Sequence, residues 1–250
     1  GTLVAKAEDI GFNYGDTQVI SRFSTTILKG DRIGILGPNG AGKTTTFHMI
    51  VGLIASRRGR VYLGDEEITT LPMYQRARRG VGYLSQEPSV FRKLTVRQNL
   101  ELSSPGGRTV LSSLFFRRTP KLVARIQEIA ETIYLVDELD MSAGLLSHGQ
   151  KQWLEIGMLL MQRPRLLLVD EPVAGMTEQE MERTAELLTG LAGKQSVVVV
   201  EHDMGFVRSI ARKVTVLHQG SVLAEGSMDQ VSNDPKVVEV YLGSDEEESA

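Results

Sequence analysis

The residues with the clearest chemistry lie in a glycine-rich segment, GPNGAGKTT, at positions 37–45. Gly37, Gly42, Lys43 and Thr44 match the pattern G-x-x-x-x-G-K-[ST], and an apolar, strand-like run precedes them. Glycines allow the backbone to curl so that several N–H groups face one anion, and a helix expected to begin near Gly42 adds its positive end. Lys43 could then reach the β- and γ-phosphates, while the Thr44 hydroxyl binds Mg²⁺. The segment therefore predicts a site for a nucleoside triphosphate.

Two acidic residues follow a second apolar run. Positions 166–169 are Leu or Val throughout, and Asp170 and Glu171 come directly after them. Because ligands bind beyond the carboxyl ends of parallel strands, we expect both acids to meet the phosphate loop. Asp170 would hold Mg²⁺, directly or through water, and Glu171 would act as general base toward the attacking water. Taken alone, the two acids could equally well begin a polar loop.

Two further candidates lie at a strand end and at a helix start. His202 follows the apolar positions 197–200 and could hydrogen-bond the γ-phosphate or the attacking water, although a lone histidine there is more often structural. Ser147, in LSHGQ, is expected to cap a helix that runs to about Met161. A serine beside exposed N–H groups can also bind phosphate, and capping alone is the simpler role.

Strand-like segments that alternate with helical stretches must position these residues. This alternation predicts an α/β domain with a largely parallel sheet. Gln219 and Gly220 read as a hairpin turn between the last two strands. The expected strands are 4–10, 32–36, 61–63, 81–84, 166–169, 197–201, 214–218 and 221–225.

Between about Glu87 and Leu160 the strand pattern gives way to helical periodicity. Apolar residues recur at three- and four-residue steps along one expected helix face, at Leu122, Ile126, Ile129 and Ile133. We therefore expect a helical subdomain at about 87–160, inserted into a single domain that covers residues 1–243.

The segment 103–120 is the weakest part of this insertion, because glycine, proline and serine suggest a surface loop or a broken helix. The alternative is a docking surface, which would use Leu114, Phe115, Phe116, Arg117 and Arg118.

Composition narrows the function classes. The chain of 250 residues is 41% hydrophobic, enough for a sizeable core, and its lack of cysteine excludes disulfides and thiolate metal sites. Four scattered histidines make a metal site built only from side chains unexpected. Apart from an acidic tail at 244–250, expected to be mobile, the charge is near neutral, so nucleic acid is not an expected partner. No apolar run approaches the roughly 20 residues that span a bilayer, so a membrane role would require a partner.

In this order, the motifs resemble those of the ATPase subunits of ATP-binding cassette (ABC) transporters, from about Val4 to Gly243. GPNGAGKTT resembles the Walker A motif, LLLVDE the Walker B motif and LSHGQ the signature motif. Gln86 resembles the Q-loop glutamine, His202 the switch histidine and Tyr14 the aromatic residue that stacks on adenine. The resemblance implies an α/β fold of the P-loop NTPase type, with a mixed, mainly parallel core sheet, an antiparallel β portion and a helical subdomain.

The resemblance further implies that the protein binds ATP with Mg²⁺ and hydrolyses it. Glu171, His202 and Gln86 would be catalytic, and Thr44, Gln86 and Asp170 would bind or sense the metal. The implied nucleotide contacts are Tyr14, Gly37, Pro38, Asn39, Gly40, Ala41, Gly42, Lys43, Thr44, Thr45, Ser147, Gly149 and Gln150.

Partners are implied as well. Two copies would pair head to tail, with each ATP held between the phosphate loop of one and Ser147 and Gly149 of the other. Gln86 would lie at the junction with the helical subdomain, whose outer surface would receive a coupling helix from a transmembrane transporter subunit. The protein would then act in the cytoplasm, on the inner face of the cell membrane.

Two positions depart from the family pattern. His148 replaces the first glycine of the common signature LSGGQ, while Gly149 is retained. Thr177 stands where many relatives carry aspartate, and Thr177 with Glu180 reads as a capping box. The substitution at Thr177 puts in doubt any communication between paired sites that depends on the aspartate.

Different segments resemble different branches of the family. Positions 6–40 are similar to soluble ABC proteins of the translation-factor type, 44–99 to the lipopolysaccharide exporter ATPase, and 145 onward to urea and branched-chain amino acid importers. A recombined or designed chain and a natural mosaic both fit this pattern. Alternative functions are a soluble ABC protein acting on ribosomes or nucleic acid, and a binding-only scaffold without a native transporter.

A group of basic residues brackets Gln86 in the sequence. We expect a solvated basic face there, with contact to a membrane subunit or lipid head groups as the alternative. The group consists of Arg76, Arg78, Arg79, Arg92, Lys93 and Arg97.

Overall fold

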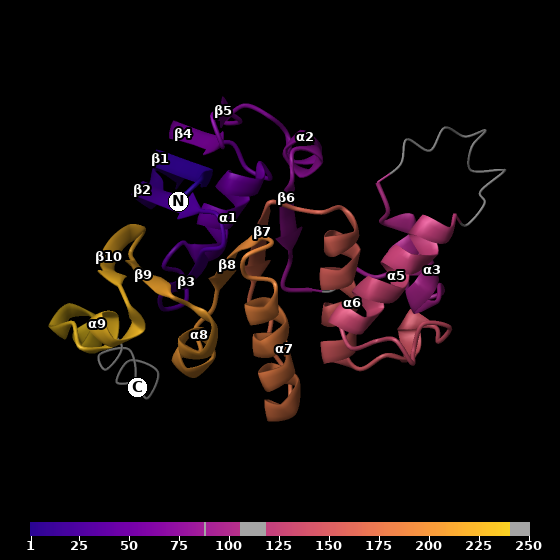
Figure 1. The fold of residues 1–250 in the computed structure, drawn as a ribbon. Helices are drawn as coiled ribbons and strands as arrows, with labels where there is room; N and C mark the ends of the chain where they lie inside the picture. Colours follow the sequence, from indigo (N-terminus) through magenta and orange to yellow (C-terminus); the bar gives the residue numbers. More distant parts are fainter. Residues whose placement is uncertain (88, 106–118, 241–250) are drawn as a thin grey trace.

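A single 10-stranded sheet organises the computed structural model, which describes residues 1–87, 89–105 and 119–240 (Figure 1). The strands lie in the order β5-β4-β1-β2-β10-β9-β3-β8-β7-β6. Their bounds are β1 (Leu3–Tyr14), β2 (Thr17–Leu28), β3 (Arg32–Leu36), β4 (Arg58–Leu63), β5 (Glu66–Glu67), β6 (Val81–Leu84), β7 (Leu166–Asp170), β8 (Ser196–Val200), β9 (Lys213–His218) and β10 (Ser221–Gly226).

The half of the sheet that carries the candidate site is parallel. Strands β6, β7, β8, β3 and β9 pair in parallel, with Ile33 of β3 opposite Val198 of β8 and Lys213 of β9. Strands β5, β4, β1 and β2 pair antiparallel, and β10 pairs antiparallel with β9. Neighbouring parallel strands end at the same edge of a sheet, so the segments after β3, β7 and β8 emerge close together.

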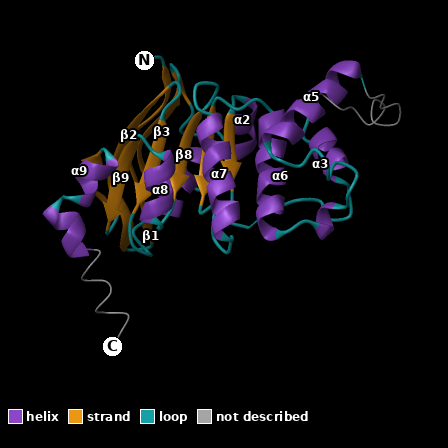
Figure 2. Ribbon diagram, turned by 60° about the horizontal axis from the view of Figure 1, so that its bottom comes forward, coloured by secondary structure: helices purple, strands orange, loops and turns teal. Residues whose placement is uncertain are grey.

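Strand β7 shows that both faces of the sheet are covered. All of its residues are buried, and successive side chains point to opposite faces. Leu167 and Val169 pack with α3, α5, α6, α7 and α8, whereas Leu166 and Leu168 pack with α1 and the antiparallel strands. The helices with both ends described are α1 (Lys43–Val51), α2 (Met73–Arg78), α3 (Val96–Leu102), α5 (Pro120–Thr132), α6 (His148–Met161), α7 (Glu178–Gly190), α8 (Met204–Ile210) and α9 (Met228–Ser232). In Figure 2, α7 and α8 lie over one face of the sheet.

Helices α3, α5 and α6 form a lobe beyond the β6 edge (Figure 1). The periodicity expected along α5 is confirmed, because Ile126, Ile129 and Ile133 are buried and Leu122 packs against the same cluster. The predicted fold class is therefore confirmed, with its parallel core, antiparallel portion and helical lobe.

Two strands, β2 and β5, were not predicted from the sequence. The possible docking surface at 114–118 and the acidic tail at 244–250 lie outside the described residues. Among the helices that are described, each falls short of the length and apolar character needed to cross a bilayer.

Candidate active site

The phosphate loop joins β3 to α1, as the sequence predicted. Gly42 is the N-cap of α1 and has a left-handed backbone, with φ 94°, so the helix begins at Lys43 and directs its N-terminus into the loop. The Lys43 side chain is buried, and its Nζ donates to the carbonyl oxygens of Gly37 at 2.6 Å and Pro38 at 3.1 Å. Burial lowers the pKa of Lys43, while nearby acids act in the opposite direction. The loop therefore carries a desolvated cation on backbone carbonyls.

Two neighbouring strands make the loop glycines necessary. A Cβ at Gly42 would clash with Ile20 of β2, and a Cβ at Gly37 would clash with the Leu217 carbonyl of β9. The predicted turn between β9 and β10 also supports the loop, because the Gly220 N–H donates to the Ala41 carbonyl at 3.2 Å. The fold therefore holds the loop from two sides.

A cavity of about 250 Å³ opens over the loop. Its lining joins the loop to one of the predicted acids, Glu171, and to Val19 of β2, which was not predicted. The lining residues are Val19, Asn39, Gly40, Ala41, Gly42, Lys43, Thr44, Thr45 and Glu171.

Asp170, the last residue of β7, lies beside the loop. Its Oδ1 accepts a hydrogen bond from the Thr44 hydroxyl at 3.3 Å, and its Oδ2 accepts one from the Tyr83 hydroxyl at 3.3 Å. Asp170 is only 2% exposed, and this burial raises its pKa. Tyr83 also contacts His48 Nε2 at 3.2 Å. A buried carboxylate beside a hydroxyl offers the oxygen ligands that Mg²⁺ prefers, so two of the three predicted metal-binding residues, Thr44 and Asp170, are brought together.

Glu171 follows Asp170 with a strained backbone. Its φ is 46°, in the left-handed region that glutamate rarely adopts, and its N–H donates to the Val200 carbonyl at 2.9 Å. This turn allows the side chain to line the cavity. Its Oε2 accepts a 2.7 Å hydrogen bond from the Gln86 side-chain amide, so two of the predicted catalytic residues are in contact.

His202, the third predicted catalytic residue, lies after β8. Its side chain is 59% exposed, and its Nδ1 is 3.5 Å from Glu201 Oε2. His202 is not among the described residues that line the phosphate-loop cavity. The structure thus places the histidine at the predicted edge of the sheet, outside the immediate surroundings of the loop.

Glu201 is a structural anchor of the site that the sequence analysis missed. Its side chain is fully buried and accepts from the backbone N–H groups of Val173 at 3.3 Å, His202 at 3.0 Å and Asp203 at 3.5 Å. Burial raises its pKa. The carboxylate therefore ties the segment after β7 to the segment after β8. The signal for it was an acid directly after an apolar strand, the same signal that identified Asp170.

The signature segment begins α6, in the helical lobe. Ser147 is the N-cap, as predicted: its Oγ accepts from the Gln150 N–H at 3.1 Å, and Gln150 Oε1 accepts from the Ser147 N–H at 3.0 Å. Thr177 and Glu180 form the predicted capping box at the start of α7. Among the described residues, the lining of the phosphate-loop cavity includes neither Ser147, Gly149 nor Gln150. Within one chain, the structure therefore does not bring the two predicted halves of the nucleotide site together.

Tyr14 ends β1 at the surface. The residue is 60% exposed, and its ring packs edge to face on Phe12, with 4.8 Å between ring centroids.

The expectation of a solvated basic face is wrong for Arg76. This side chain is 2% exposed, and its guanidinium donates to the backbone carbonyls of Leu71, Met49, Ile50 and Thr69 at 2.7–2.8 Å. Burial lowers the pKa of Arg76 to about 10. Arginine has five donors in a planar fork, so one side chain can join α1 to the segment before α2.

Two other members of the basic group have acidic partners. Arg79 pairs with Glu66 at 2.8 Å, and Arg97 pairs with Asp140 at 2.9 Å. Much of the positive charge that the sequence placed around Gln86 is therefore used inside the chain.

Comparison with known proteins identifies the family. The family described as ABC transporter matches residues 20–174, and a second, described as Branched-chain amino acid ATP-binding cassette transporter, matches residues 221–247. The lipopolysaccharide export system ATP-binding protein LptB of Haemophilus influenzae is 34% identical over 244 residues, with 96% of this chain and 97% of that protein covered. LptB of Acidithiobacillus ferridurans is 36% identical over 239 residues, with 95% and 96% covered.

A solved structure supports the same family assignment. The ADP conformation of MJ1267, an ATP-binding cassette of an ABC transporter, superimposes with a TM-score of 0.85 at 30% identity and covers 97% of this chain and 100% of that one. Because single relatives align with nearly the whole chain, the likeness of its segments to different branches does not require a recombined origin. The chain belongs to the ATP-binding proteins of ABC transporters, a family of ATPases.

Proposed function

We propose that this protein binds and hydrolyses Mg-ATP and uses the cycle to drive a separate transmembrane transporter subunit. One observation carries the proposal: two segments far apart in the sequence bring a buried cation, a hydroxyl and a carboxylate to one cavity, with a second carboxylate hydrogen-bonded to that hydroxyl. Lys43 and Glu171 line that cavity, and the Thr44 hydroxyl lies 3.3 Å from Asp170. Thr44 and Asp170, the two proposed ligands of Mg²⁺, are therefore already adjacent.

The chain's own residues account for the chemistry. Lys43 would exchange the carbonyls of Gly37 and Pro38 for phosphate oxygens, assisted by the N-terminus of α1. Thr44 and Asp170 would hold Mg²⁺, which neutralises charge on the phosphates. Glu171 would orient the attacking water and accept its proton, and the hydrogen bond from Gln86 would hold the Glu171 carboxylate in place.

The remaining predicted contacts belong to a head-to-tail dimer in this proposal. The start of α6 carries Ser147, Gly149 and Gln150. Ser147 is exposed and Gln150 is half-buried, so a second chain could bring its ATP there. His202 would reach the γ-phosphate on closure, and Tyr14 would stack on the base. Aromatic stacking tolerates any base, so we propose ATP as the nucleotide because the chain belongs to a family of ATP-binding proteins.

Coupling to the membrane would start at Gln86. This residue touches Glu171 and lies between the sheet and the helical lobe in sequence, so a partner pressing on that junction would move the proposed base. We propose that the outer surface of the helical lobe receives the transmembrane subunit at the inner face of the membrane. Residues 1–243 would form one ABC ATPase domain, with the helical subdomain at about 87–160.

Light scattering on the Glu171→Gln variant tests the proposal. With Mg-ATP bound and hydrolysis blocked, we expect a particle with twice the mass of one chain, and we expect the added change Ser147→Ala to raise the Mg-ATP concentration that pairing needs. A mass of one chain at saturating Mg-ATP would contradict the dimer. Co-purification of a membrane protein that stimulates ATP turnover tests the coupling.

A further inference from the structure

Glu180 joins the starts of two helices that carry the proposed dimer contacts. Its Oε1 accepts a hydrogen bond from the Ser147 hydroxyl at 2.8 Å, at the start of α6. Its Oε2 accepts from the Thr177 N–H at 3.1 Å and the Thr177 hydroxyl at 3.2 Å, at the start of α7. One carboxylate thus occupies the space between two helix N-termini, where negative charge is stabilised.

Gly149 makes this approach sterically possible. A Cβ at Gly149 would lie 2.7 Å from both Cδ and Oε1 of Glu180, a distance that real Cβ atoms do not reach. The glycine retained in LSHGQ therefore leaves room for an acid of the same chain, at the helix start that is proposed to receive the partner's phosphate.

The charge on Glu180 is maintained by its surroundings. Burial alone would raise its pKa, but hydrogen bonds from Thr177 and Ser147 lower it, and His148 acts in the same direction. The carboxylate is therefore ionised at neutral pH. His148, the position that departs from the common signature, is close enough to act on it.

The Ser147 hydroxyl cannot serve Glu180 and a phosphate together. It has one proton, which it donates to Glu180, while its Oγ already accepts from the Gln150 N–H. An incoming γ-phosphate would have to take that proton and would meet a negative carboxylate beside it. Like charges this close repel each other strongly away from bulk water.

We propose that Glu180 is a positioning residue that holds the signature serine in the unpaired chain and opposes ATP-driven pairing, because its carboxylate competes with the γ-phosphate of the partner's ATP for Ser147. This inference rests on the proposed function, in which Ser147 contacts that phosphate across the dimer. Glu180 thereby raises the ATP concentration at which two chains close.

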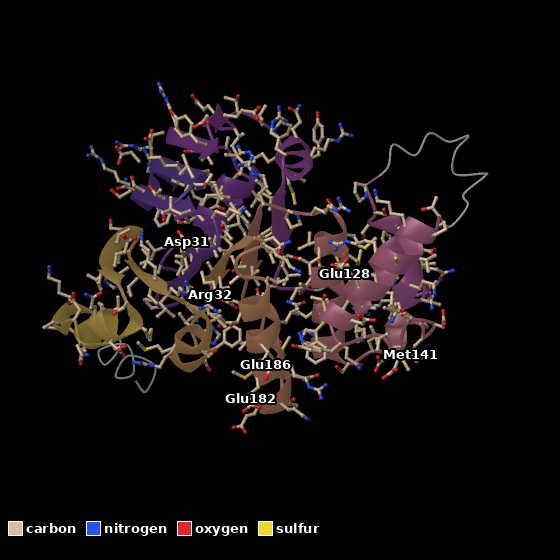
Figure 3. All side chains as sticks on the ribbon, in the orientation of Figure 1. Asp31, Arg32, Glu128, Met141, Glu182 and Glu186 are labelled. Atoms are coloured by element: carbon tan, nitrogen blue, oxygen red, sulfur yellow. The ribbon has the colours of Figure 1, made fainter. Side chains whose placement is uncertain are left out.

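The variant Glu180→Gln separates charge from structure. Glutamine also forms capping boxes at the third helix position, where its amide oxygen accepts from the Thr177 N–H. The cap of α6 is made by Ser147 and Gln150 without Glu180, so both helix starts are retained while the second carboxylate oxygen is lost to Ser147. In the Glu171→Gln background, we expect Glu180→Gln to lower the Mg-ATP concentration for half-maximal dimer about tenfold, measured by light scattering. The matched control is Glu182→Gln, an equal charge change at an exposed position two residues further along α7 (Figure 3), which should leave that concentration unchanged.

The outcomes divide clearly. An unchanged or higher concentration for Glu180→Gln, or an equal fall for Glu182→Gln, would overturn the competition for Ser147 while leaving the proposed dimer intact. If the Glu171→Gln parent fails to pair at all, or if Ser147→Ala does not affect its pairing, the proposed function itself fails and the role of Glu180 fails with it. In the otherwise native chain, Glu180→Gln should also lower the ATP concentration for half-maximal hydrolysis, a change that a loss of folded protein would not produce.

Discussion

The side-chain amide of Gln86 donates a 2.7 Å hydrogen bond to the carboxylate of Glu171. The two residues are far apart in the chain, and each follows a neighbouring parallel strand, β6 for Gln86 and β7 for Glu171. The contact links the proposed general base to the segment that leads into the helical lobe. Any displacement of that segment would therefore change the orientation of the base.

Replacing Gln86 by alanine tests this link. The Glu171 carboxylate would lose its restraint but keep its charge, so we expect ATP turnover to fall about tenfold, less than the roughly 10²–10⁴-fold that removal of a general base would cost. Mg-ATP affinity should change little. Steady-state turnover and nucleotide titration measure the two quantities separately. A parallel loss of affinity and turnover would mean that Gln86 acts mainly in binding the nucleotide.

The hairpin turn that supports the phosphate loop offers a second prediction. Gly220 has φ 74°, and a Cβ there would clash with the Val19 carbonyl. We expect Gly220→Ala to destabilise the protein by roughly 2–3 kcal/mol, since both left-handed strain and crowding contribute. Mg-ATP affinity should fall as well, because the Gly220 N–H holds the Ala41 carbonyl.

Gly193→Ala provides the control for that variant. Gly193 has φ 92°, and a Cβ added there would meet no atom within 4 Å. Gly193→Ala therefore measures the cost of the left-handed backbone without a steric clash. Denaturant unfolding should therefore show the smaller loss for Gly193→Ala, with Mg-ATP affinity unchanged. Equal losses would mean that the contact with Val19 relaxes at little cost and that the turn does not support the loop as proposed.

A buried acid in the helical lobe leads to a pH prediction. Glu155 accepts from the Ser89 N–H at 2.9 Å and the Ser89 hydroxyl at 2.6 Å, and burial raises its pKa above the ordinary 4.5. The folded state therefore binds the proton more tightly than the unfolded state does. The contribution of Glu155 to stability is then greatest below pH 4.5 and declines as pH rises through the folded pKa.

Glu155→Gln removes this titration and keeps an oxygen for Ser89. We expect the free energy of unfolding of the variant to rise relative to wild type as pH increases above 4.5, because only the wild type must ionise a buried group. Chemical denaturation of both proteins across that range measures the difference. A difference that moves in the opposite direction would mean that the hydrogen bonds from Ser89 lower the folded pKa.

Much of this fold was predictable where local chemistry and local structure agree. The strands at 32–36 and 81–84 were predicted to the residue, because short apolar runs bounded by glycine or polar residues are typical of buried parallel strands. Ser147 was recognised as a helix cap from its position before a helical segment, and Thr177 from its spacing to Glu180.

The missed features depend on contacts that no local pattern records. Strand β2 has several register shifts against β1, so its buried residues do not alternate regularly and the expected period of two is lost. Arg76 looked like one of several surface cations, but it fills a site made of backbone carbonyls from distant segments. Glu201 carried the local signal of an acid after an apolar strand, but its hydrogen bond from the Val173 N–H, like that from the Ser147 hydroxyl to Glu180, joins segments that only the folded chain brings together.

The central claim is that Lys43, Thr44, Asp170 and Glu171 act together on the terminal phosphate of Mg-ATP. Bound nucleotide and turnover in the Glu171→Gln variant test it most directly. We predict that the variant holds Mg-ATP at least as tightly as the wild type while its turnover falls by at least about 100-fold, as expected when a general base is removed. Wild-type turnover in this variant would contradict the account.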